Sequence, residues 1–167
     1  MLALSLLLGA IIRGQPPAVL SADGPAQIET DRPLIALTFD DGPRRSTTET
    51  LLDGLAERGV KATFFLVGEM IPGCEDLIRR MAEEGHQIGT HSYDHVYLTG
   101  LNAADFARQV DRTENLLSEL LGGGNFALRP PYGMIDNGVE KRTGSPLILW
   151  SVDPEDWDDK NTARIVE

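Results

Sequence analysis

Two adjacent carboxylates are among the residues best suited to chemistry in this chain. Asp40 and Asp41 follow a short apolar run and lead into the turn-forming pair Gly42-Pro43. Neighbouring carboxylates in such a turn point in different directions, so that one can bind a metal while the other accepts a proton. An ordinary Asp-Gly-Pro turn is the alternative for this segment taken alone.

A pair of histidines supplies a second candidate group. His91 and His95, two of the three histidines in the chain, lie four residues apart in a polar loop after a predicted strand. Two imidazoles and one carboxylate can bind zinc and leave its fourth position open to water. We therefore predict a metal site that contains both histidines; a chance pairing of histidines is the alternative. The third histidine, His86, precedes the strand, and we expect it to be structural.

Two further segments combine charged and aromatic residues. Arg129 opens a Pro-rich turn that includes Tyr132 and ends at Gly133, where a main-chain N–H can donate to an oxyanion. Asp156 and Trp157 follow an apolar run, so that Asp156 can hold Arg129 and Trp157 can form the wall of an apolar pocket. An ordinary Pro-rich turn and a solvated acidic loop are the alternatives.

These segments lie between elements that alternate in type. We predict a helix started at Ser46 by a capping box with Glu49, a helix over 76–84, a long helix capped by Asn102 and ended by Gly122, and a weaker helix over 135–142. The alternation predicts an α/β fold with parallel strands, as an open sheet or a barrel, and in a barrel the loops after the strands share one face. The strand candidates are residues 34–38, 60–67, 87–90, 126–129 and 147–152.

Composition limits the fold and the partners. The 167 residues suit one domain, and 41% of them are hydrophobic, which is enough for a buried core. Fifteen Lys and Arg against 26 Asp and Glu give a net charge of −11, so we expect no binding to nucleic acid. The single cysteine, Cys74, excludes an intrachain disulfide framework and a thiolate cluster. A metal would therefore be bound by histidines and carboxylates.

The N-terminal residues differ in composition from the rest. Residues 2–12 form an apolar run that is too short to cross a bilayer but has the length of a secretory h-region. We expect a signal-like segment over 1–22, a linker over 23–33, and a secreted or cell-envelope protein with no stable membrane insertion beyond this segment. A truncated membrane anchor or a buried apolar helix is the alternative.

Taken in order, four segments resemble the motifs of the polysaccharide deacetylase family, also called NodB-homology or carbohydrate esterase family 4. Thr38–Pro43 matches TFDDGP, His91–His95 matches H-S/T-x-x-H, Arg129–Gly133 matches R-x-P-Y/F-G, and Asp153–Trp157 matches DxxDW. The resemblance covers residues 34–167. It implies a distorted (β/α) barrel that removes N- or O-acetyl groups from glycans such as peptidoglycan or chitin oligosaccharides.

The resemblance also implies roles for single residues. Asp40 would be the general base and Arg129 would orient it, while Asp41, His91 and His95 would bind a divalent metal, with zinc preferred. The metal would polarise the carbonyl and activate water, and the neighbouring carboxylate would accept the proton.

The resemblance implies that the remaining motif residues contact the substrate or hold Arg129. Pro131, Tyr132 and Trp157 would contact the substrate, with the Tyr132 N–H donating to the oxyanion and Trp157 lining the acetyl pocket. Asp156 would fix Arg129.

The sequence departs from the family at its fifth motif. Leu-x-His, which supplies the general acid downstream of DxxDW, has no match here, and no histidine follows His95. We therefore expect a truncated domain, a barrel without its last strands, and a monomer that acts on acetylated glycan. An inactive metal- or glycan-binding remnant and a nonenzymatic envelope protein are the alternatives.

Overall fold

The computed structural model describes residues 34–158 and 161. The expected signal-like segment 1–22 and linker 23–33 lie outside the described residues and stay predictions. Within the described part, no helix combines the length and the apolar character needed to span a membrane.

A parallel three-stranded sheet forms the centre of the fold. Its strands are β1 (Thr38–Gly42), β2 (Thr63–Leu66) and β3 (Gln87–Thr90), in the order β1-β2-β3. The pairing is in register at Thr63, which lies opposite Thr38 on one side and Gln87 on the other. The α/β class predicted from the alternating pattern is therefore confirmed.

The sheet does not close into a barrel within the described residues. The fourth and fifth strand candidates make only isolated bridges, Thr90 with Leu128 and Leu128 with Leu147. The first strand begins four residues later than predicted, and Leu34 and Ile35, which the prediction included, are 73% and 88% exposed.

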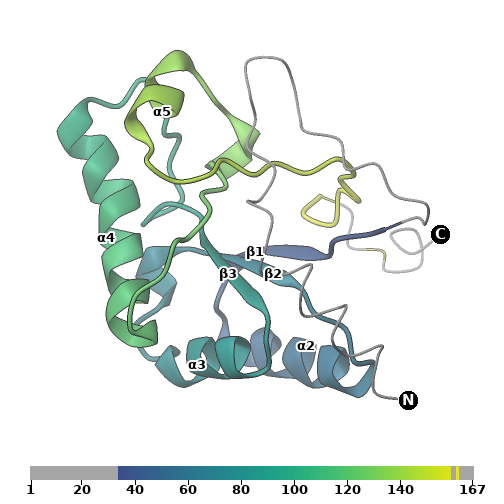
Figure 1. The fold of residues 1–167 in the computed structure, drawn as a ribbon. Coiled ribbons are helices and arrows are strands. Elements are labelled where there is room, and N and C mark those ends of the chain that lie inside the picture. Colours follow the sequence, from purple (N-terminus) through teal and green to yellow (C-terminus); the bar gives the residue numbers. More distant parts are fainter. Residues whose placement is uncertain (1–33, 159–160, 162–167) are drawn as a thin grey trace, which may run out of the picture.

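In the described residues, four α-helices lie around the sheet: α2 (Arg45–Glu57), α3 (Glu75–Glu83), α4 (Ala103–Leu121) and α5 (Asn137–Arg142). Figure 1 shows α2 and α3 side by side below the sheet and α4 along its left side. Two short 3₁₀ turns, η1 (Gly68–Met70) and η2 (Pro131–Gly133), follow β2 and the Arg129 segment. The elements thus alternate as the sequence predicts.

The N-terminal cap of α4 is the one predicted from the sequence, whereas the cap of α2 is not. Asn102 caps α4 by accepting the Asp105 N–H at 3.0 Å, as predicted. The capping box predicted at Ser46 is wrong, because α2 already begins at Arg45. The backbone N–H of Arg44 instead donates to the Thr48 hydroxyl at 2.9 Å.

Two clusters of buried side chains hold these elements together. The first joins β2 to α2, α3 and α4, and the second joins α4 and α5 to the segments that follow β3. The second cluster fixes the chain next to the candidate functional residues. Its buried members are Leu98, Phe106, Val110, Leu128, Val139 and Leu147.

His86 has the structural role expected for it. Its ring is buried between α3 and β3, and Nδ1 accepts the backbone N–H of Ala62 at 3.1 Å. Burial lowers the pKa of His86 below the ordinary value of an imidazole, and Lys61 acts in the same direction. The ring is therefore held neutral in the core, away from the histidine pair.

Candidate metal centre

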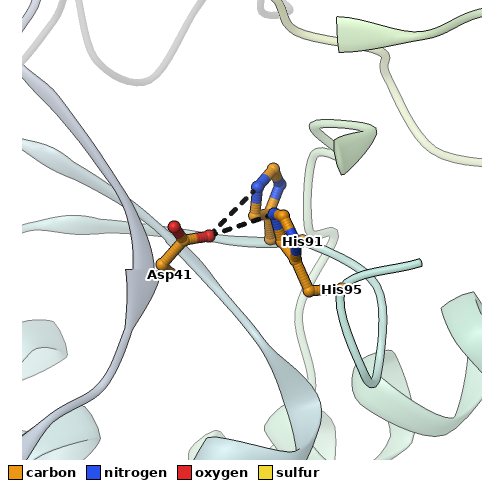
Figure 2. Close-up of side chains that lie close together, drawn as sticks. All are labelled: Asp41, His91 and His95. Atoms are coloured by element: carbon orange, nitrogen blue, oxygen red, sulfur yellow. Dashed lines mark ion pairs between the residues drawn. The ribbon is translucent and has the colours of Figure 1, made fainter. Parts of the chain in front are cut away.

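Asp41, His91 and His95 come together at the carboxyl edge of the sheet (Figure 2). Asp41 belongs to β1, and both histidines lie in the loop after β3. Oδ1 of Asp41 is 3.5 Å from Nε2 of His91 and 3.2 Å from Nε2 of His95. One ligand atom from each residue lies within 4.8 Å of the others, which suits a single divalent ion.

An irregularity in β1 brings Asp40 to the same place. Neighbouring residues of a regular strand point to opposite faces. The register of β1 against β2 shifts between Phe39 and Gly42, and Asp41 has a φ of +62°. Oδ2 of Asp40 consequently lies 3.9 Å from His91 Nε2, close to Asp41. Both carboxylates thus approach His91, while Arg129 pairs with Asp40 and His95 pairs with Asp41, and their separate roles stay a prediction.

Left-handed backbone conformations concentrate at this centre. In the described residues, five non-glycine residues have a positive φ, and four of them belong to the three segments that form the site. Such conformations cost about 1–3 kcal/mol each and persist where the surrounding structure imposes them. The site is therefore held in a defined shape by the fold. The four residues are Asp41, Ser92, His95 and Tyr132.

The orientation of His91 is fixed by a backbone carbonyl. Its Nδ1 lies 2.7 Å from the carbonyl oxygen of Arg129, which can only accept, so Nδ1 carries the proton and Nε2 faces Asp41. Burial lowers the pKa of His91 below its ordinary value, although the carboxylates of Asp40 and Asp41 oppose this shift. The ring is thus kept neutral, which is the form that binds a metal.

The side chain of Arg129 holds Asp40. It is 3% exposed, and its Nη1 donates to Oδ1 of Asp40 at 2.7 Å and to the Thr38 hydroxyl at 2.8 Å. Its guanidinium carbon lies 4.0 Å from the ring centre of Phe65, on the face of β2 opposite Phe64. One oxygen of Asp40 is therefore occupied, and the other lies 3.9 Å from Nε2 of His91.

Tyr132 lies against the second histidine. Its ring meets that of His95 edge-on at 4.8 Å between centres, and its hydroxyl donates to the His95 carbonyl at 3.4 Å. Pro131 is buried, and the backbone hydrogen bonds of this turn are donated by Gly133 and Met134. The Tyr132 N–H is not among the backbone donors in the described residues, so its role toward an oxyanion stays a prediction.

The structure does not bring Asp156 and Trp157 to the other site residues. Both are exposed, Trp157 by 72%, and residues 150–158 pack against no core cluster. The described partners of Arg129 are Asp40, Thr38 and two backbone carbonyls, without Asp156. The contact between Asp156 and Arg129 and the pocket at Trp157 are therefore not formed here, and both roles stay predictions.

Sequence reasoning missed the residue that supports the histidine loop from α4. Oε1 of Gln109 accepts the backbone N–H groups of Tyr93 and Asp94 at 3.1 and 3.2 Å. The guanidinium of Arg112 lies 3.6 Å from the ring centre of Tyr93, and the Thr113 hydroxyl donates to the Ser92 carbonyl. A glutamine within an amphipathic helix gives no local signal of such a role.

Replacement of Gln109 by methionine is expected to weaken zinc binding by about 10-fold or more, because loss of outer-shell hydrogen bonds commonly costs 10–100-fold. Gln109→Glu keeps an acceptor oxygen and is expected to bind zinc at least as tightly as the unaltered chain. Competition with a chromophoric chelator measures both affinities, on variants with matched unfolding temperatures. Equal affinity in Gln109→Met would mean that the loop keeps its shape without this support.

Comparison with known proteins agrees with this geometry. The family model described as Polysaccharide deacetylase matches residues 27–145. The chain belongs to the polysaccharide deacetylase family. The resemblance carried by the four motifs is thereby confirmed, and Asp41, His91 and His95 are consistent with the divalent metal site of that family.

Curated members of the family share about two fifths of the aligned residues. The peptidoglycan-N-acetylglucosamine deacetylase PgdA of Listeria monocytogenes is 41% identical over 133 residues, which cover 80% of this chain and 28% of PgdA. The chitooligosaccharide deacetylase of Rhizobium leguminosarum bv. phaseoli is 36% identical over 156 residues, covering 90% of this chain and 68% of that protein. The chain therefore spans little more than a quarter of the length of PgdA.

A solved structure of the family has the same fold. The peptidoglycan deacetylase PdaC from Bacillus subtilis superposes with a TM-score of 0.78 at 37% identity, over 83% of this chain and 69% of PdaC. The open α/β sheet described above thus corresponds to part of a polysaccharide deacetylase domain.

Proposed function

We propose that this protein is a metal-dependent deacetylase that hydrolyses the acetamido groups of N-acetylglucosamine residues in a glycan such as peptidoglycan or a chitin oligosaccharide. The observation that carries the proposal is the ion pair of Asp40 with buried Arg129, placed beside the Asp41, His91 and His95 cluster. The names of the family relatives support the substrate class, since both act on N-acetylated glycans. Because peptidoglycan lies outside the cytoplasm, we place the activity there.

In this proposal the carboxylate of Asp40 takes the proton of the attacking water and returns it to the sugar nitrogen as the C–N bond breaks, so that acetate and the free amine are released. Arg129 holds Oδ1, so that Oδ2 is the oxygen that accepts the proton. The N–H of Tyr132 donates a hydrogen bond to the acetyl oxygen as negative charge develops on it. A divalent metal bound by Asp41, His91 and His95, for which zinc is our choice, supplies Lewis-acid stabilisation of the same charge.

The experiment is acetate release by the 167-residue chain from N-acetylated chitooligosaccharide and from peptidoglycan. The zinc-loaded protein is expected to release acetate, the chelated protein to release none, and added zinc to restore the rate. Rates that are unaffected by chelation would contradict a metal-dependent reaction.

A second candidate is a metal- or glycan-binding protein without catalysis. It is favoured by the exposure of Asp156 and Trp157, which contact none of the other site residues in the described part of the chain. One zinc per chain together with no acetate from either glycan would support this candidate over the first.

A further inference from the structure

An exposed pair of stacked tyrosines lies directly beside the candidate metal centre. The ring centres of Tyr97 and Tyr132 are 4.2 Å apart, and the interplanar angle is 22°. Tyr97 is 53% exposed and Tyr132 is 51% exposed. Tyr132 in turn contacts the ring of His95. The three rings therefore form a continuous row that leads from a metal ligand to solvent, each step about the width of one ring.

The position of Tyr97 is fixed by its neighbours in sequence. His95, two residues earlier, belongs to the histidine cluster, and Leu98, the next residue, is fully buried in the second core cluster. Tyr132 is held as well, because Gly133 packs so closely on Trp150 that a Cβ added there would lie 2.8 Å from the indole ring. Since both tyrosines are held before any ligand arrives, ordering them costs little on binding.

The chemistry of this surface suits a neutral sugar ring. A pyranose presents apolar C–H groups on its face and hydroxyls at its rim, and a tyrosine offers a flat apolar ring with a polar hydroxyl. Tyr97 and Tyr132 carry no charge, and the adjacent exposed side chains Val96 and Met134 are apolar. An anionic or cationic ligand would find no charged partner among these four side chains.

We propose that Tyr97 forms a subsite for the sugar residue adjacent to the one whose acetyl group is removed. The inference rests on the proposed function for the nature of the glycan. It assigns Tyr97, which lies outside the four motifs, to substrate recognition: its ring stacks on the neighbouring sugar, and Tyr132 supports the ring from behind. Because the ring of Tyr132 contacts both His95 and Tyr97, we expect a single N-acetylglucosamine at the metal centre to make no contact with Tyr97.

Isothermal titration of the zinc-loaded chain with N-acetylglucosamine and with its tetramer tests this subsite. Asp40→Asn serves as the background, so that the ligand is not consumed. Introducing Tyr97→Ala into the Asp40→Asn protein is expected to weaken binding of the tetramer by about 5–10-fold, which is the range of one aromatic stacking contact. Binding of the monomer should not change, and Tyr97→Phe should bind the tetramer within about twofold of the background protein.

Unchanged tetramer binding in Tyr97→Ala would overturn the subsite, as would an equal loss for monomer and tetramer. The acetate assay on the unaltered chain separates this result from the proposed function. Acetate release without any effect of Tyr97→Ala on tetramer affinity rejects the subsite alone. Tyr97-dependent tetramer binding without acetate release keeps the subsite and rejects deacetylation.

Discussion

Asp40→Asn is expected to lower the rate of acetate release by about 10²- to 10⁴-fold, the usual contribution of a general base. An amide has nearly the shape of the carboxylate but cannot take a proton from water. Its oxygen can still accept from Arg129, so the partner of the buried guanidinium is kept. Zinc binding is expected to stay nearly intact, because Asp41, His91 and His95 are unchanged. Initial rates with N-acetylated chitooligosaccharide and zinc per chain, measured on one preparation, give both quantities.

Asp94→Asn is the matched control for this loss of charge. Asp94 is exposed and lies in the histidine loop, yet none of the described side-chain contacts involves its carboxylate. The control should keep the rate of the unaltered chain. A normal rate in Asp40→Asn would assign the base to another group, and an equal fall in both variants would indicate a general effect of charge near the loop.

The residues of the metal cluster could be predicted from the sequence because their types and positions are informative. Two histidines four apart after a strand candidate, with aspartates after another, are brought together by the geometry of parallel strands, whose carboxyl ends share one edge. The exact start of β1 could not be predicted. Leu34 is as apolar as the residues of a strand, yet it is exposed in the structure and lies before the first strand.

The shape of the site depends on features that residue types do not reveal. Aspartate and histidine adopt a left-handed backbone more often than most non-glycine residues, yet such cases are uncommon, so residue type alone does not mark Asp41 or His95 for a positive φ. The support by Gln109 comes from a helix that begins after the loop is complete, and it is visible only once α4 is packed. The backbone shape of the site and its support by α4 therefore depend on packing between distant segments, which the local sequence pattern does not reveal.

The same limit explains the outcome for the last motif. The sequence places Asp156 in a DxxDW segment, but a motif fixes residue types and leaves open what packs over them. In the structure the contacts of Arg129 are satisfied by Asp40, Thr38 and the carbonyls of Ile148 and Leu149. The role of Asp156 toward Arg129 therefore stays a prediction.

The metal site can be tested by replacing each of the three histidines of the chain in turn. His95→Ala is expected to weaken zinc binding by at least about 100-fold, since loss of an outer-shell partner alone costs 10–100-fold. His91→Ala should lose zinc as well, but His91 is buried, so its removal also leaves a cavity that lowers the free energy of unfolding. His95 is partly exposed and gives the cleaner measurement.

His86→Asn serves as the control, because the asparagine oxygen can replace Nδ1 as acceptor for the Ala62 N–H, and His86 lies outside the cluster. Zinc per chain after dialysis against a competing chelator, measured by atomic absorption, should fall in His95→Ala and stay at the unaltered level in His86→Asn. Full zinc content in a folded His91→Ala, His95→Ala double variant would place the metal elsewhere. The carboxylate pair of Asp40 and Asp41 would then have to be explained without it.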